Sequence, residues 1–409
     1  MYDVYANARE VAVNLSTQDS PYIDEACAWM TRMAPSFPEK LMDPLVWGRY
    51  VRDDTSNSDD EIDMLARGVI NDIKSNIRNE KRDPDFLRGF YAVLSAFAAE
   101  WWTRAWVVQE FRASQAAVFI IGQCSVKSAV LMAIMIALAQ TSLHDLRLPD
   151  SSFVGDALKH WSFDDIDYIT ALGNSIMLLC GTAYGNGGLG EFLYLCRFRK
   201  ATDARDKVYA YLGLIDSKYE IKPNYESKGP EGVRRMLIEI TRQMIIHDEN
   251  LDILRWVFPK RSTRHRPSWV PDWTELDVYA TAFPGYMHKF SSADPQVAFS
   301  SHDEVLSVRG AYIGTLDRME PPSGTQKAFG HDSWKFHVSQ DCYVHVASIS
   351  IRSCKLGDQA WILFGSEGVF LLREENDAFR LIGLASVKDD MGKVWRMEET
   401  CGQRRINII

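Results

Sequence analysis

The sequence has little glycine and proline, 25 and 15 residues of 409, and it has no low-complexity segment. This composition excludes a collagen-like or disordered chain. It also has no long run of lysine and arginine, and its formal net charge is −9. A negative chain offers no field that attracts phosphate backbones, so we expect no nucleic acid among its partners.

Cysteines are few and scattered, and none of the seven forms a C-x-x-C pair. The sequence therefore predicts neither a zinc site nor a disulfide framework. The first residues show no basic segment followed by an apolar one, so no secretory signal is visible. From these absences we expect a reduced, cytoplasmic protein without a metal.

Long hydrophobic runs are absent too. The most apolar stretch covers residues 129–139, which is shorter than the roughly 20 residues that a bilayer requires. We predict a buried helix there and no membrane partner.

The chain does contain the hydrophobic periodicity of an α+β protein. In the first 140 residues we predict a strand at 11–15 and helices at 22–33, 60–77 and 83–114. Residues 117–122 form a continuous apolar run that ends in glycine. Such a run is typical of a strand that is buried on both faces.

The hydrophobic pattern changes twice along the chain. Residues 141–250 look mostly helical, with clear helical spacing over 231–247, whereas short apolar runs alternate with turn residues beyond 251. Regular short runs of this kind predict an antiparallel β-rich module. We therefore predict three parts, covering 1–140, 141–250 and 251–409.

Four segments carry a more specific pattern. They are residues 102–110 (WTRAWVVQE), 203–214 (DARDKVYAYLGL), 267–273 (PSWVPDW) and 357–365 (GDQAWILFG). In this order they resemble the fungal heterokaryon incompatibility (HET) domain family, and the resemblance covers most of the chain. It implies a role in fungal non-self recognition and regulated cell death, with protein partners or self-association.

The sequence also departs from that family. It has no Tyr-x-Ala-Leu-Ser-Tyr-x-Trp-Gly strand and no aromatic strand that ends in Asp-x-x-Cys-Ile-Asn-Gln. Residues 1–9 resemble the helix that usually follows those strands, and residues 387–392 stand where relatives often have a His-Gly-x-Met-Asp-Gly-Glu run. We therefore expect either an N-terminally truncated or a divergent HET protein. The resemblance implies an incomplete flavodoxin- or TIR-like part, then the helical region and the β-rich module.

The same resemblance points to Glu110. HET domains are similar to TIR domains, many of which cleave the nicotinamide–ribose bond of NAD with one glutamate in a Trp-Val-x-x-Glu-like helix before a buried strand. Trp106 and Glu110 have the matching spacing, which would put them on one helical face with Trp102 a turn earlier. We therefore take Glu110 as the candidate catalytic residue, and Trp102, Trp106 and Arg104 as candidate substrate-binding residues. NAD would be the substrate, and no cofactor is expected.

Two other interpretations stay open. In one, Glu110 only pairs with Arg104 or Arg112 or caps a loop, and the protein is a non-catalytic interaction scaffold. In the other, the scaffold serves small-molecule metabolism, and tryptophans near residues 101–113 line an enclosed pocket for an apolar ligand. The sequence leaves the choice among these three functions to the structure and to experiment.

Overall fold

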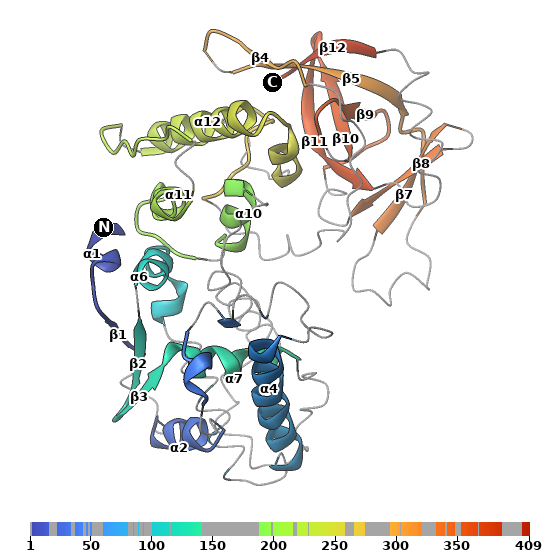
Figure 1. Cartoon of the computed structure of the whole chain (residues 1–409). Coiled ribbons are helices and arrows are strands. Elements are labelled where there is room, and N and C mark those ends of the chain that lie inside the picture. Colours follow the sequence, from blue (N-terminus) through green and yellow to red (C-terminus); the bar gives the residue numbers. More distant parts are fainter. Residues whose placement is uncertain are drawn as a thin grey trace. The chain divides into compact units, whose positions relative to one another are not determined.

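The computed structural model describes the larger part of the chain. The described residues are 2–15, 23–33, 37–43, 46, 47, 50, 60–80, 85, 89, 93, 100–114, 116–140, 188–197, 199–215, 219–227, 229–257, 266–274, 295–302, 304–320, 333–339, 342–347, 353–366, 368–386 and 403–409. They fall into two compact units, unit 1 with residues 1–187 and 198–215, and unit 2 with residues 188–197 and 216–409. Helices and two sheets together give the mixed α and β composition that an α+β protein requires (Figure 1).

Unit 1 surrounds a small three-stranded sheet of order β1-β2-β3, in which β1 and β2 are parallel and β2 and β3 form an antiparallel hairpin. Gly122 opens the two-residue turn of this hairpin with a φ of 60°, a conformation that glycine adopts without strain. The elements are α1 (Tyr2–Ala6), β1 (Val11–Asn14), α2 (Ile23–Met33), η1 (Glu39–Leu41), α4 (Glu61–Glu80), η3 (Glu100–Thr103), α6 (Val107–Ala113), β2 (Ala117–Ile121), β3 (Cys124–Lys127), α7 (Ser128–Gln140), α11 (Asp206–Tyr209) and η4 (Leu212–Leu214).

The predictions of β1, α2, α4 and α7 are confirmed, with ends that differ by a few residues. The prediction for β2 is wrong in one respect. Its burial alternates, because Ala117, Phe119 and Ile121 are buried whereas Val118 and Ile120 are only half-buried. One face of the strand therefore packs into the core, and the other is only partly covered.

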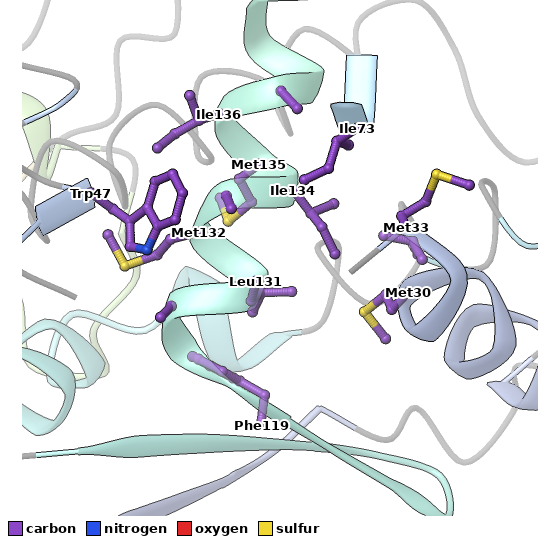
Figure 2. Close-up of a cluster of buried hydrophobic side chains, with 14 of the residues drawn as sticks. Met30, Met33, Trp47, Ile73, Phe119, Leu131, Met132, Ile134, Met135 and Ile136 are labelled. Atoms are coloured by element: carbon purple, nitrogen blue, oxygen red, sulfur yellow. The ribbon is translucent and has the colours of Figure 1, made fainter. Parts of the chain in front are cut away.

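The core of unit 1 forms around α7 (Figure 2). Residues 129–137 of this helix are buried or half-buried on every side, because α4, β2 and β3 pack against it. Ile134 and Ile73 of α4 are both fully buried, and so is Trp47. The indole N–H of Trp47 donates to the Leu41 carbonyl at 2.9 Å, which satisfies its polar group inside the core. The prediction of a buried helix is confirmed, and no described helix is long and apolar enough to cross a membrane.

A disulfide joins Cys27 of α2 to Cys124 of β3, with 6.0 Å between their Cα atoms. The expectation of a fully reduced chain is wrong for this pair. The two cysteines are 97 residues apart in the sequence, so spacing gave no sign that folding brings α2 against the hairpin.

Removing this disulfide is expected to destabilise unit 1. The variant with Cys27→Ser and Cys124→Ser frees a loop of 97 residues in the unfolded state. The entropy that the unfolded chain regains lowers the free energy of unfolding by at most about 4–5 kcal/mol. Urea denaturation of the oxidised wild type, the reduced wild type and the double variant measures the effect. Equal midpoints for all three would show that the bond contributes nothing to stability.

Unit 2 contains the strands that the pattern beyond residue 251 predicts, and all but one of their described pairings are antiparallel. Its elements are α10 (Gly188–Leu195), α12 (Gly229–Asp248), η5 (Asp252–Trp256), β4 (Ala298–Phe299), β5 (Leu306–Thr315), β6 (Arg318–Glu320), β7 (Ser333–Ser339), β8 (Cys342–Ala347), β9 (Gln359–Leu363), β10 (Val369–Glu375), β11 (Ala378–Ser386) and β12 (Gln403–Ile408). The helical spacing predicted for 231–247 is confirmed by α12, in which Leu237, Ile240 and Met244 are buried.

The strands of unit 2 form one nine-stranded sheet. Eight of its strands have the order β10-β9-β5-β12-β11-β8-β7-β6, and the ninth, β4, pairs with β5. In addition, β10 pairs with β11. This extra pairing closes β10, β9, β5, β12 and β11 into a ring (Figure 1). Asn376 and Asp377 connect β10 to β11 with φ values of 49° and 64°, as a tight two-residue hairpin turn requires.

An ion pair between the buried Asp358, next to β9, and the half-buried Arg373 of β10 lies in this ring. Asp358 is completely buried, and its carboxylate accepts hydrogen bonds from the Arg373 guanidinium at 2.8 and 3.0 Å and from the Lys355 N–H at 2.8 Å. Burial, and then the charge of Asp358, raise the pKa of the nearby Cys354 thiol to about 12. Cys354 is therefore protonated at neutral pH, and we expect it to react slowly with alkylating agents.

Arg373→Ala is expected to destabilise the protein by about 3–5 kcal/mol, because it leaves a buried carboxylate without its cation. Arg380→Ala is the matched control. It breaks a pair with Glu375 that is about one-third exposed, and such pairs contribute at most about 1 kcal/mol. Chemical denaturation of both variants measures the difference, and similar losses would contradict a structural role for Asp358.

The predicted boundaries at 140 and 250 stay a prediction. Residues 141–187, which form the first part of the expected helical region, lie outside the described residues. Within the described part, α12 belongs to the same unit as the C-terminal strands.

Candidate functional site

The segment before α6 is not the continuous helix that the sequence predicts for residues 83–114. The 3-10 helix η3 ends at Thr103, and the next residues pair with Lys200 in a short parallel bridge. The Lys200 N–H donates to the Thr103 carbonyl at 2.5 Å, and the Ala105 N–H donates to the Lys200 carbonyl at 2.8 Å. This pairing takes Arg104 out of helical geometry, so α6 starts afresh at Val107.

Glu110 lies in the first turn of α6. Its N–H donates to the Trp106 carbonyl at 3.1 Å, so the two residues are one helical turn apart and share a face, as the spacing predicts. The side chain of Glu110 is half-buried. Within the described part of the chain it forms no ion pair with Arg104 or Arg112, and the interpretation that an arginine neutralises it stays a prediction.

The partner of Glu110 is Tyr5 of α1, the helix that packs against α6. Burial raises the pKa of the Tyr5 phenol above its ordinary value of 10.0, and the charge of Glu110 and a hydrogen bond to its carboxylate raise it further, whereas the positive charge of Arg104 lowers it. The phenol is therefore protonated at neutral pH and can donate to the carboxylate. The sequence pattern did not identify Tyr5, because it lies more than 100 residues before Glu110.

The two candidate tryptophans occupy different environments. Trp102 is 2 % exposed. Its indole is stacked on Phe119 with 5.2 Å between ring centroids, and it meets Trp101 edge-on at 4.8 Å. Trp102 is therefore a core residue rather than part of a ligand-binding wall. Trp106 is half-buried, and among the described residues its indole has no ring partner. Of the two candidate tryptophans, only Trp106 can therefore line a site beside Glu110.

Arg104, the remaining candidate, is exposed and lies directly across the bridge from Lys200, which is also exposed. Beside them, the guanidinium of Arg199 is 1 % exposed and donates to the Trp102 carbonyl at 2.5 Å. Lys200 and Arg199 were not predicted as site residues. They are about 100 residues from Arg104 in the sequence, and only the backbone pairing brings them to it.

The segment that follows the bridge has a structural role. The Arg205 guanidinium donates to both carboxylate oxygens of Asp203, at 2.9 and 2.6 Å, and this side-chain hydrogen bonding holds the pKa of Asp203 below its usual value. The Arg205 N–H also donates to Asp203, at 3.0 Å. This local network fixes the turn that leads into α11. Among the described residues, no cluster of His, Cys, Asp and Glu is suited to bind a metal.

Comparison with known protein families, with curated proteins and with solved structures finds no match. The likeness to HET proteins therefore depends on the four sequence segments alone.

Glu110→Gln is expected to lower the pKa of Tyr5, because it removes the negative charge that disfavours the phenolate. The pKa should stay above 10.0, because burial is the largest cause of the shift. Since the folded-state pKa is raised, the stability that Tyr5 contributes is present below pH 10 and is lost as the pH rises through the raised value.

Carbon-13 NMR of ζ-labelled tyrosine, with Tyr5→Phe to assign the signal, measures this pKa. Asp3→Asn is the matched control, because Asp3 is an exposed acid of the same helix and is not among the groups that shift Tyr5. An unchanged titration in Glu110→Gln would show that the two side chains do not interact.

Proposed function

We propose that the chain is a HET-like protein of fungal non-self recognition and regulated cell death, and that Glu110 hydrolyses the nicotinamide–ribose bond of NAD. The observation that carries this proposal is a half-buried carboxylate in the first turn of α6 that lies beside the Tyr5 phenol and forms no described ion pair. A carboxylate placed in this way can stabilise a positive reaction centre.

The chemistry of NAD suits a single carboxylate. When the bond between the ribose C1 and the nicotinamide nitrogen breaks, its electron pair leaves with nicotinamide, which becomes neutral and needs no proton from an acid. The ribose is left as an oxocarbenium ion, which the negative charge of Glu110 stabilises. Water then adds to C1 and releases a proton, and the products are nicotinamide, ADP-ribose and a proton.

The architecture of unit 1 supports a TIR-like origin for this site. β1 and β2 are parallel, with Val11 opposite Ala117, and they are connected through helices that include α6. Parallel strands joined through helices are the basic unit of flavodoxin-like folds. In this proposal α6 presents Glu110 where the chain enters the middle strand of the sheet.

The proposal locates the protein in the cytoplasm, with protein partners or self-association in signalling. A cytoplasmic environment would expose the Cys27–Cys124 pair to thiol reductants. The aromatic pocket of the metabolic interpretation gains no support at residues 101–113, because Trp101 and Trp102 both pack on Phe119.

Incubation of the purified chain with NAD, followed by chromatographic assay of nicotinamide, tests the proposal. Glu110→Gln is expected to reduce release by at least about a hundredfold, as when one electrostatic group of an active site is lost. Glu100→Gln, which changes an exposed carboxylate on the neighbouring η3, should leave release unchanged. Circular dichroism verifies that both variants fold.

If the wild-type chain releases no nicotinamide, or if Glu110→Gln retains full release, NAD hydrolysis by Glu110 is wrong. The non-catalytic scaffold is then the better account of the protein.

A further inference from the structure

We propose that Arg104 and Lys200 together bind the diphosphate of the dinucleotide beside Glu110. This inference deepens the proposed function and rests on it for the identity of the ligand. The binding of a diphosphate group by these two cations can nevertheless be tested without any reaction.

The backbone holds the two cations side by side. Arg104 and Lys200 are direct partners in the parallel bridge, and residues paired in this way point to the same side. Both side chains are exposed, and within the described part of the chain neither forms an ion pair. Two like charges placed opposite each other repel, so a bound dianion would relieve an unfavourable contact as well as form two favourable ones.

Arg199 adds a third positive charge next to this pair. Arg199 precedes Lys200 and is almost completely buried, and its Nε–H has no hydrogen-bond partner among the residues that the structure describes. Its one described hydrogen bond goes to the carbonyl of Trp102, which carries no net charge. No described carboxylate pairs with Arg199, and a buried charge is poorly screened, so Arg199 raises the positive potential at the nearby bridge.

The carboxylate and the cations belong to one locality. The Tyr5 phenol responds both to the negative charge of Glu110 and to the positive charge of Arg104, so both side chains lie near its ring. NAD has the complementary pattern, because its nicotinamide ring is positive and its diphosphate is negative on either side of one ribose. The site would thus hold the ribose with the ring toward Glu110 and the diphosphate toward Arg104 and Lys200.

The test is calorimetric titration of the full chain with inorganic pyrophosphate and with ADP-ribose, neither of which contains the bond to be cleaved. Arg104→Ala and Lys200→Ala are each expected to weaken binding about tenfold, and the double variant more, because each removes a charge-assisted contact. Added salt should weaken wild-type binding too. Since the bridge uses backbone atoms only, the variants should fold.

Two control variants sharpen this experiment. Lys127→Ala removes an exposed cation of unit 1 on β3 and should leave both affinities unchanged. The exchange of Arg104→Lys with Lys200→Arg keeps both charges and should retain binding within a few-fold. In the NAD assay, Arg104→Ala and Lys200→Ala are expected to raise KM more than they lower kcat, as positioning residues do.

The outcomes separate this inference from the proposed function. If pyrophosphate binding depends on Arg104 and Lys200 but no nicotinamide is released, the anion site is confirmed and the proposal of NAD hydrolysis is wrong. If nicotinamide release depends on Glu110 while the double variant keeps its affinities and KM, the anion site is wrong. Absence of pyrophosphate binding to the wild type at millimolar concentrations would also overturn it.

Discussion

The backbone pairing between residues 103–105 and Lys200 is the constraint on which the candidate site depends. Its two hydrogen bonds, at 2.5 and 2.8 Å, end η3 and set the point where α6 begins. Because α6 begins at Val107, Glu110 falls in its first turn, on the same face as Trp106. The same pairing brings Arg199 and Lys200 to Arg104 from about 100 residues further along the chain. One short bridge thus decides both the direction of the carboxylate and the position of the cations.

The aromatic and charged side chains around this bridge form two groups that differ in their exposure to solvent. Trp102 and Phe119 stack in the core and hold β2 against η3, so their role is structural. Trp106, Glu110 and Tyr5 are half-buried, and Arg104 and Lys200 are exposed, so they remain accessible to a ligand. Trp102 and Trp106 therefore have different roles although both are tryptophans of one segment. The bridge at Arg104 separates the 3-10 helix that holds Trp102 from α6, which begins after Trp106.

Hydrophobic pattern was sufficient for much of the fold. The apolar residues 129–139 are too many for a typical buried strand and too few to cross a bilayer, so a buried helix was the prediction, and α7 confirms it. Periodicity likewise located α4, α12 and several strands of unit 2. Periodicity did not predict strands that form only because distant strands pair with them. β12, with Arg404 and Arg405 among its residues, looks polar, and it is a strand because β5 and β11 supply its hydrogen bonds.

The sequence by itself determined the elements whose burial follows from their own composition, and it identified Glu110 and Trp106 as neighbours one helical turn apart. Only the tertiary structure decided what surrounds them. The electrostatic interaction of Tyr5 with Glu110, the pairing of Arg104 with Lys200 and the bond between Cys27 and Cys124 all join residues about 100 positions apart. Contacts over such separations depend on how whole elements pack, because no local propensity of either segment specifies its distant partner.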